Sequence, residues 1–379
     1  MMTAYLDNSA TTKPTKEVAD KVYEMLTDNF GNASSFHKMG LDAMFEVRKA
    51  RQNLANALSC DLDEIIFTSG GTEANNLAIL GAVDANKRKG NRIVTTSIEH
   101  ESVLQTCDYL ETKGFEVIKL DVDEYGYINP NDLYNAINKD TILVSMMYVN
   151  NEVGSIMPIK EIKKAVKQAN SPALIHVDCV QAFGKLDVKP KKLGADLLTV
   201  TAHKIHGPKG IGALYIKKGV RILPRTHGGE QEKRIRPGTE STPLIAGFGK
   251  AVEQIPNLKK QSEKTKELNQ YLRQELEKID GIIINSSPNA SDYIMNIYVP
   301  TFMTSQTVVQ HLSSQYGVYV SNGSACAKGK RSHVLTAMKL NEKIIDKSIR
   351  VSFSRDNTIK DVDMFINAIK ETIKTHPEK

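Results

Sequence analysis

Short apolar segments alternate with longer helical patterns from about residue 61 onward, and this alternation limits the fold more than any other feature of the sequence. The strand-like segments are 64–68, 92–97, 115–122, 141–149, 173–178, 196–201 and 212–216. Helical patterns such as 102–113 and 159–169 lie between many of them. Strands that alternate with helices predict a mostly parallel sheet covered on both faces, so we expect an α/β fold.

The pattern changes near residue 254. Residues 256–280 predict a long charged helix, in which Leu268, Leu272, Leu276 and Ile279 form an apolar stripe at helical spacing. Strand-like segments follow at 282–285, 292–299, 316–321 and 348–354. We therefore expect a large domain over residues 15–255 and a smaller α+β domain formed by residues 1–14 and 256–379.

The composition is that of an ordinary soluble globular protein of 379 residues, with 40% hydrophobic residues and a net charge of +6. Without a stripe of basic and aromatic residues, this mild positive charge does not indicate nucleic-acid binding. No apolar run approaches the ~20 residues that span a bilayer, and the N-terminus has no secretory pattern, so we expect a cytoplasmic protein that does not enter membranes. The four cysteines form no CxxC pair, and no metal site is predicted.

A glycine turn follows the strand-like segment 64–68 and opens a helical pattern. It reads Ser69-Gly70-Gly71-Thr72. Backbone N–H groups at a helix N-terminus and a threonine hydroxyl suit a phosphate group. The turn lacks the GxxxxGK[ST] pattern of a nucleotide-binding P-loop, and alone it is equally compatible with an ordinary strand-to-helix connection.

Polar side chains follow four more of the predicted strands. They are His100, Asn151, Asp178 with Gln181 three residues later, and Lys204. Each alone also fits an ordinary turn or strand end, but ligands of open α/β sheets bind where parallel strands end. A phosphate cradle, a histidine that can stack, a carboxylate for a ring nitrogen and a lysine amine are together what a protein offers to pyridoxal phosphate.

The sequence resembles the cysteine desulfurases of the class V aminotransferase family, the NifS/IscS-like pyridoxal-phosphate enzymes. The resemblance covers nearly the whole chain and rests on motifs in a fixed order: YLDNSATT, GNASSFH, FTSGGTEANNLAI, EHESV, YVNNEVG, HVDCVQAFGK, TAHKIHGPKGIGALY, HGGEQEKRIRPGTES, SNGSACA and SIRVSFSR. It implies the fold type I of pyridoxal-phosphate transferases, with a mostly parallel, seven-stranded-type sheet in the large domain and a smaller α+β domain.

The resemblance assigns roles around the ring of pyridoxal 5'-phosphate. Lys204 would hold the cofactor as a Schiff base, Asp178 would pair with the ring nitrogen, and Gln181 would lie near the phenolic oxygen. His100 would stack on the ring and take part in catalysis. Asn151 would lie close to both cofactor and substrate.

The resemblance also assigns contacts to the phosphate and the substrate. The expected phosphate-binding residues are Gly71, Thr72, Thr201, His203 and Thr239. Thr239 would reach the phosphate across a dimer interface, which implies a homodimer. Arg350 would hold the substrate carboxylate, a task that suits the two parallel N–H groups of a guanidinium.

Cys326 is the nucleophile that such an enzyme requires. It lies in the small, polar segment SNGSACAKGKRSH, where Lys328, Lys330 and Arg331 would favour the reactive thiolate. The three other cysteines lie in apolar or helical surroundings. The segment is slightly shorter than in family members with a long loop and lacks their proline, which leaves the sulfur acceptor open.

The resemblance implies that L-cysteine is converted to L-alanine, that a persulfide forms on Cys326, and that the sulfur passes to an acceptor protein. That acceptor would serve tRNA thiolation or the assembly of iron–sulfur clusters or thio-cofactors. The alternatives are a selenocysteine lyase, another class V enzyme of the aminotransferase type, or a non-catalytic scaffold. Cys326 argues against a plain aminotransferase, which needs no such cysteine, and the complete set of cofactor residues argues against a scaffold.

Overall fold

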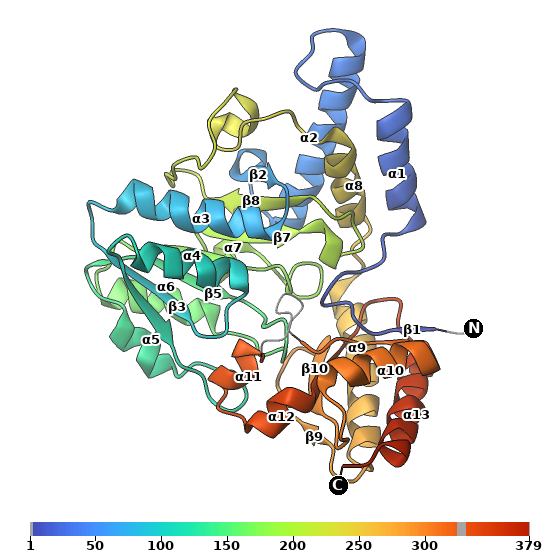
Figure 1. The fold of residues 1–379 in the computed structure, drawn as a ribbon. Coiled ribbons are helices and arrows are strands. Elements are labelled where there is room, and N and C mark those ends of the chain that lie inside the picture. Colours follow the sequence, from blue (N-terminus) through green and yellow to red (C-terminus); the bar gives the residue numbers. More distant parts are fainter. Residues whose placement is uncertain (1–2, 324–330, 379) are drawn as a thin grey trace.

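A seven-stranded sheet forms the centre of the part of the chain described by the computed structural model, residues 3–323 and 331–378 (Figure 1). Its order is β2-β8-β7-β6-β5-β3-β4. The strands are β2 (Ile65–Thr68), β3 (Arg92–Thr96), β4 (Glu116–Leu120), β5 (Thr141–Met147), β6 (Leu174–Asp178), β7 (Leu197–Thr201) and β8 (Gly212–Ile216). Only β8 runs antiparallel to its neighbours in this sheet, because a short loop joins it to β7 without a crossover. The predicted mostly parallel sheet is confirmed.

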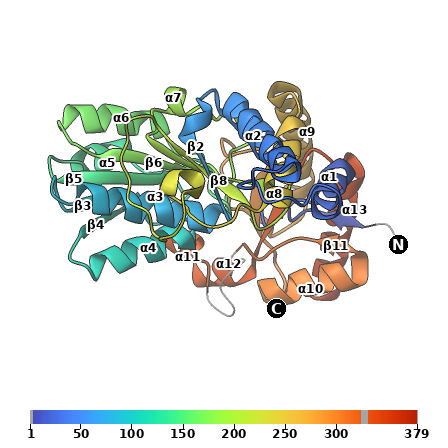
Figure 2. The same cartoon turned by 90° about the horizontal axis from the view of Figure 1, so that it is seen from above.

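Helices cover both faces of this sheet, as Figure 2 shows. On one side lie α3 (Gly71–Asn86) and α4 (Glu101–Glu111), and on the other lie α6 (Ile159–Gln168) and α7 (Pro190–Leu193). Helix α5 (Pro130–Ala136) follows β4. Every residue of β5 and β7 is buried, which explains why their sequences are mostly apolar and do not alternate between apolar and charged residues.

Two N-terminal helices occupy a region for which no element was predicted. They are α1 (Lys16–Thr27) and α2 (Lys38–Leu58), and they pack on α8 (Thr242–Glu253) at the top of Figure 1. Close contact explains the glycine at position 249, since a β-carbon there would lie 2.6 Å from Ala50. Much of the outer surface of α1 and α2 is left uncovered.

The C-terminal part contains two smaller sheets within the described residues, with orders β12-β10-β9 and β1-β11. Their strands are β1 (Ala4–Tyr5), β9 (Ile283–Ile284), β10 (Ile294–Tyr298), β11 (Val318–Tyr319) and β12 (Ser348–Ser352). The helices are α9 (Leu258–Leu276), α10 (Ser305–Tyr316), α11 (His333–Ala337), α12 (Glu342–Lys347) and α13 (Ile359–Thr375). Leu268, Leu272 and Leu276 of the predicted stripe are buried, and Ile279 packs against their cluster.

The N-terminal strand packs with this C-terminal part. Strand β1 pairs in parallel with β11, and Ala4 and Leu6 belong to the same apolar cluster as α9 and α13. Val334 and Leu335 of α11 instead pack in the cluster beneath the large sheet. The domain boundary near residue 255 stays a prediction.

No described helix has the length and hydropathy needed to cross a membrane.

Candidate active site

The predicted strand-end residues gather at one edge of the large sheet. Asp178 is the last residue of β6, Asn151 follows β5, and Lys204 follows β7 in a short 3-10 turn, Ala202–Lys204. His100 is the N-cap of α4, and Gly71 is the first residue of α3. The parallel strands place their carboxyl ends together, so the spacing of these residues in the sequence becomes proximity in space.

The Lys204 amine is directed at the N-terminal segment of the chain. Its Nζ donates to the carbonyl oxygens of Ser9 and Ala10, the latter at 2.7 Å. Burial of the amine, together with the positive charges of Arg350 and Lys185, lowers the pKa of Lys204 to about 7. A large fraction of this amine is therefore neutral and nucleophilic near neutral pH.

Asp178 is a buried carboxylate held by neutral donors. Asn75 Nδ2 on α3 donates to Asp178 Oδ2 at 2.8 Å, and the Val180 N–H donates to Oδ1 at 2.9 Å. No cationic side chain pairs with Asp178 among residues 3–323 and 331–378. A buried carboxylate without a cation is costly, so this site calls for a positively charged ligand group.

His100 is held in one orientation by the first turn of its own helix. Its Nδ1 accepts from the Ser102 N–H at 3.1 Å and lies 2.9 Å from Ser102 Oγ. Burial lowers the pKa of His100, so the ring is neutral at neutral pH and carries its proton on Nε2. Asn75 donates to Ser102 Oγ as well, at 2.9 Å, which links the supports of His100 and Asp178.

The expected phosphate-binding residues lie around the start of α3 and the end of β7. A β-carbon at Gly71 would lie 2.9 Å from a Val180 methyl group, so any larger residue would have to displace Val180, and Thr72 is exposed beside it. Thr201 Oγ1 donates to the Ile211 carbonyl at 3.1 Å and would have to turn away to donate to a phosphate. His203 Nδ1 lies 3.3 Å from Thr11 Oγ1, and burial lowers the pKa of His203 to about 3.

Thr239 lies apart from these groups. It is exposed, and its side chain makes no hydrogen bond with the rest of the described chain. The preceding Arg236 pairs with Glu73 in the first turn of α3, with Nε 2.8 Å from Oε1. The segment therefore borders the start of α3 while Thr239 itself stays open to solvent.

Gln181 shares an acceptor with Lys204. Its Nε2 donates to the Ser9 carbonyl at 3.0 Å, and its Oε1 faces the Lys185 amine at 3.3 Å. Neither Ser9 nor Lys185 was predicted from the sequence as a site residue. Both lie in motifs of the family resemblance, Ser9 in YLDNSATT and Lys185 in QAFGK.

Arg350 on β12 brings the C-terminal part of the chain to the site. It is 1% exposed, and its Nη2 donates to Asp7 Oδ1 at 2.7 Å while Nη1 donates to the Asn151 carbonyl at 2.9 Å. Its Nε is buried and has no partner among the described groups. The guanidinium thus lies against the Asn151 carbonyl through Nη1 and keeps N–H groups without a described partner, from which an anionic ligand can accept a hydrogen bond.

Cys326 and its neighbours 324–330 lie outside the described residues. Both flanks of that segment end at the site. The Gly323 carbonyl accepts from Arg350 Nη1 at 3.3 Å, and Ser332 Oγ donates to the buried Glu152 at 2.6 Å. The other cysteines are poor nucleophiles: burial raises the pKa of Cys60 and of Cys107 to about 12, and that of Cys179 well above its usual value.

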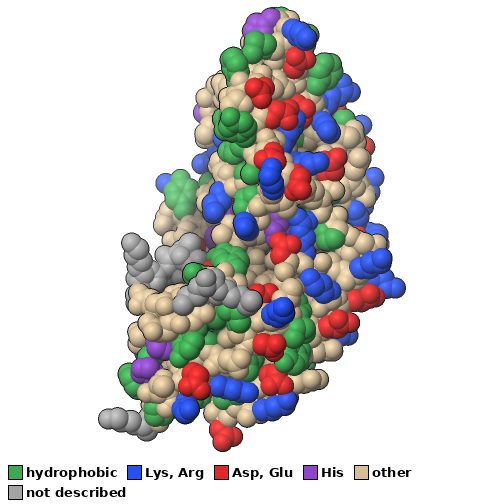
Figure 3. Space-filling view, turned by 90° about the vertical axis from the view of Figure 1, so that its right-hand side faces the viewer, with side chains coloured by type: hydrophobic (Ala, Val, Ile, Leu, Met, Phe, Trp, Pro, Cys, Tyr) green, Lys and Arg blue, Asp and Glu red, His purple; other side chains and the backbone are tan. Residues whose placement is uncertain are grey.

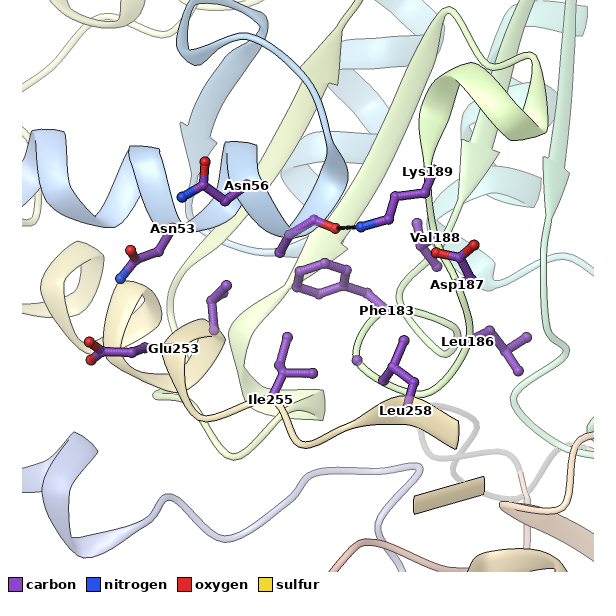
Figure 4. A pocket seen from close by; sticks show the side chains of 13 residues that line it. Asn53, Asn56, Phe183, Leu186, Asp187, Val188, Lys189, Glu253, Ile255 and Leu258 are labelled. Carbon is purple, nitrogen blue, oxygen red and sulfur yellow. Dashed lines mark hydrogen bonds between the residues drawn. The ribbon is translucent and has the colours of Figure 1, made fainter. Parts of the chain in front are cut away.

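Two observations show that these residues fit pyridoxal 5'-phosphate. Lys204 is an amine whose pKa is lowered to about 7 and that has no carboxylate partner in the described chain, and Asp178 is a buried carboxylate that lacks a cation there. The described residues contain no cluster of three or more His, Cys, Asp or Glu side chains that would hold a metal ion. A pocket of about 350 Å³ lies elsewhere, between α2 and the Phe183–Lys189 turn, and contains none of the predicted site residues (Figure 4).

Comparison with known proteins gives a consistent result. The profile of the family described as aminotransferase class-V matches residues 4–365. A "Cysteine desulfurase IscS" from Methanosarcina thermophila is 44% identical over 375 residues, which cover 98% of this chain and 92% of that protein. A solved structure named "NIFS-like protein" superposes with a TM-score of 0.92 at 36% identity, covering 99% and 100% of the two chains. Another, "SspA in complex with cysteine", has a TM-score of 0.82 at 34% identity and covers 94% of this chain and 100% of its own.

Proposed function

The chain belongs to the class V aminotransferase family, among its cysteine desulfurases, and from that premise we propose that it converts L-cysteine to L-alanine and keeps the sulfur as a persulfide on Cys326. One observation carries the proposal: the charges of Asp178 and Arg350 both act on the Lys204 amine, and Arg350 has a buried N–H without a partner among the described residues. The amine of Lys204 suits the aldehyde of the cofactor, and the carboxylate of Asp178 suits its cationic ring. The guanidinium of Arg350 suits the carboxylate of the substrate.

The cofactor is pyridoxal 5'-phosphate, which when bound supplies an electron-accepting ring for the pair released at the substrate α-carbon. Lys204 would bind it covalently, and its pKa of about 7 lets Nζ both give and take a proton near neutral pH. Asp178 would keep the ring nitrogen protonated, and Asn75 holds that carboxylate in place. Neutral His100 would stack on the ring, and Gln181 would donate to the phenolic oxygen.

Arg350 would orient the substrate. Asp7 and Asn151 hold its Nη atoms in place, and the guanidinium N–H groups that have no partner among the described residues would donate to the carboxylate of L-cysteine. The Cys326 thiolate would attack the sulfur of that cysteine, the carbon–sulfur bond would break, and the β-carbon would take a proton to give L-alanine. The family resemblance identifies Cys326, and the high pKa values of the three other thiols support the assignment.

A homodimer is part of this proposal. Exposed apolar side chains lie on α1, α2 and the connection between them, and Figure 3 shows hydrophobic side chains at this upper end of the molecule. They include Tyr23, Leu26, Phe30, Phe36 and Phe45, and Phe36 is 98% exposed. So many large apolar groups in one region favour burial against a second copy. Light scattering in solution would measure the mass, and a monomer at micromolar concentration would contradict the dimer.

The acceptor of the sulfur would be a protein of tRNA thiolation or of iron–sulfur or thio-cofactor assembly. Persulfide transfer from labelled cysteine to purified candidate acceptors would identify it. A selenocysteine lyase remains the alternative in the same family, and L-selenocysteine in the same assay separates the two activities.

The test of the activity uses three variants with cofactor and L-cysteine. Cys326→Ser should keep the visible band of the bound cofactor, form no persulfide by mass spectrometry and release no alanine. Lys204→Ala should lack the band that borohydride fixes to the protein. Cys60→Ser is the matched control and should react as wild type, because the Cys60 thiol is mostly protonated. Full turnover by Cys326→Ser would refute the assigned nucleophile.

A further inference from the structure

A second buried lysine lies next to the cofactor residues, and the mechanism above gives it no task. Lys185 is 6% exposed, and its Nζ lies 3.3 Å from Gln181 Oε1 and 5.5 Å from the centre of the Tyr293 ring. No carboxylate pairs with it within the described residues. Burying an ammonium group without a carboxylate partner costs free energy, so we infer that Lys185 has a functional role.

Gln181 and Lys185 lie on one helical turn. The Lys185 N–H donates to the Ala182 carbonyl and the Leu186 N–H to the same oxygen, which sets Gln181 and Lys185 on the same face, four residues apart. The turn is packed tightly on the segment that follows Lys204. A β-carbon at Gly184 would lie 2.7 Å from Ile205, and a cavity of about 30 Å³ is lined by both Lys185 and Lys204.

The contacts of Gln181 fix which way its amide faces. An ammonium group can only donate, so the atom of Gln181 that faces Lys185 must be the oxygen. A carbonyl oxygen can only accept, so the atom that faces Ser9 must be the nitrogen. Both contacts select the same orientation, and the second hydrogen of Nε2 has no acceptor in the part of the chain that is described.

We propose that Lys185 is a positioning residue that locks the Gln181 amide with its N–H toward the phenolic oxygen of the cofactor. The inference rests on the proposed function, because it assigns Gln181 to that oxygen. Without Lys185 only the Ser9 carbonyl would select this orientation, so the amide would present its oxygen, which repels a phenolate, in a larger share of the molecules. Lys185 prevents this rotation by offering only donors.

The charges around Lys185 agree with this role. Burial, together with the positive charge of Arg350 on β12, lowers the pKa of Lys185 to about 8, and Lys185 contributes to the lowered pKa values of Lys204, His203 and His206. The remaining charged side chain at the shared cavity is Arg355. Lys185 thus adds positive charge at a point where a negatively charged cofactor oxygen would be stabilised.

The test is a spectrophotometric pH titration of the visible band of the lysine-bound cofactor in the holoenzyme. Lys185→Met should raise the pKa of that titration by roughly one unit, because a donor and a positive charge are lost. Gln181→Leu should raise it as well. The double variant should shift less than the sum of the two, since Lys185 acts through Gln181. An unchanged titration in Lys185→Met, or additive shifts, would overturn the proposal.

Two further variants keep the test informative. Lys189→Met is the matched control. Lys189 follows on the same connection, but its amine donates to the Ala57 carbonyl in the separate pocket of Figure 4. The cofactor band of this variant should therefore titrate with the same pKa as that of wild type. If Lys185→Met does not fold, Lys185→Gln gives the same expectation, because an amide both donates and accepts and no longer dictates the orientation of Gln181. A wild type without any visible band would refute the proposed function, which is a different outcome.

Discussion

Asp7 and Arg350 join the two ends of the chain at the active site: Asp7 Oδ1 lies 2.7 Å from Arg350 Nη2, although 343 residues separate them. Arg350 is buried on β12, and Asp7 belongs to the segment that also gives Ser9 to Lys204 and Gln181. The ion pair therefore fixes the substrate-binding arginine relative to the cofactor-binding lysine.

Replacing Asp7 by asparagine should weaken both stability and substrate binding. The buried guanidinium would lose the one carboxylate that pairs with it among the described residues, so we expect the free energy of unfolding in urea to fall by about 1–3 kcal/mol and KM for L-cysteine to rise. Asp20→Asn is the control, because the Lys16–Asp20 pair is exposed and should contribute less than about 1 kcal/mol. Equal losses in the two variants would show that the buried pair has no special role.

The reaction of the apoprotein with pyridoxal phosphate should depend on pH through Lys204. Because burial lowers the pKa of Lys204 to about 7, the neutral amine is already abundant at pH 8. The rate at which the visible band appears should rise with pH below about 7 and level off above it. A rate that keeps rising toward pH 10, as for an ordinary lysine, would contradict the lowered pKa.

Asn75 should support the cofactor through Asp178. Asn75→Ala removes one of the two donors that Asp178 has within residues 3–323 and 331–378, so we expect the cofactor Kd to rise about tenfold, or ~1.4 kcal/mol. Asn86→Ala is the matched control on the same helix, since Asn86 lies at the far end of α3 and donates to the Ala82 carbonyl. A cofactor titration would compare them, and equal affinities would exclude this role for Asn75.

Glu99 should make stability depend on pH. Its carboxyl is fully buried, with Oε1 accepting from Thr96 and Met147 and Oε2 without a partner among the described groups, and burial raises its pKa to about 8. Between the unfolded value near 4.3 and this folded value, the folded state binds a proton that the unfolded state lacks. The contribution of Glu99 to stability is therefore present at low pH and is lost as pH rises through about 8.

The measurement is urea unfolding at pH 6 and pH 8 for wild type and Glu99→Gln. The variant cannot titrate at this position, so its stability should fall less than that of wild type over the same interval. Because the other titrating groups are the same in both proteins, their contributions to the pH dependence cancel in the comparison. A parallel fall would mean that Glu99 is not protonated in the folded protein.

Local patterns in the sequence determined the central sheet and the edge at which the site lies. Strands alternating with helices must form a largely parallel sheet, and parallel strands bring Asp178, Asn151 and Lys204 to one edge whatever the rest of the chain does. The ordered motifs likewise determined the family. Helices α1 and α2 were not predicted, and Cys326 as nucleophile stays a prediction from the motif.

Only the tertiary structure decided how these residues are supported. Nothing in the spacing of the sequence pairs Asp7 with Arg350, Asn75 with Asp178, or Lys185 with the free face of Gln181. Periodicity reports which face of an element is buried, whereas these contacts depend on how separate elements pack and on which polar atoms remain unsatisfied afterwards. The sequence thus determines which groups reach the site, and packing determines their protonation and orientation.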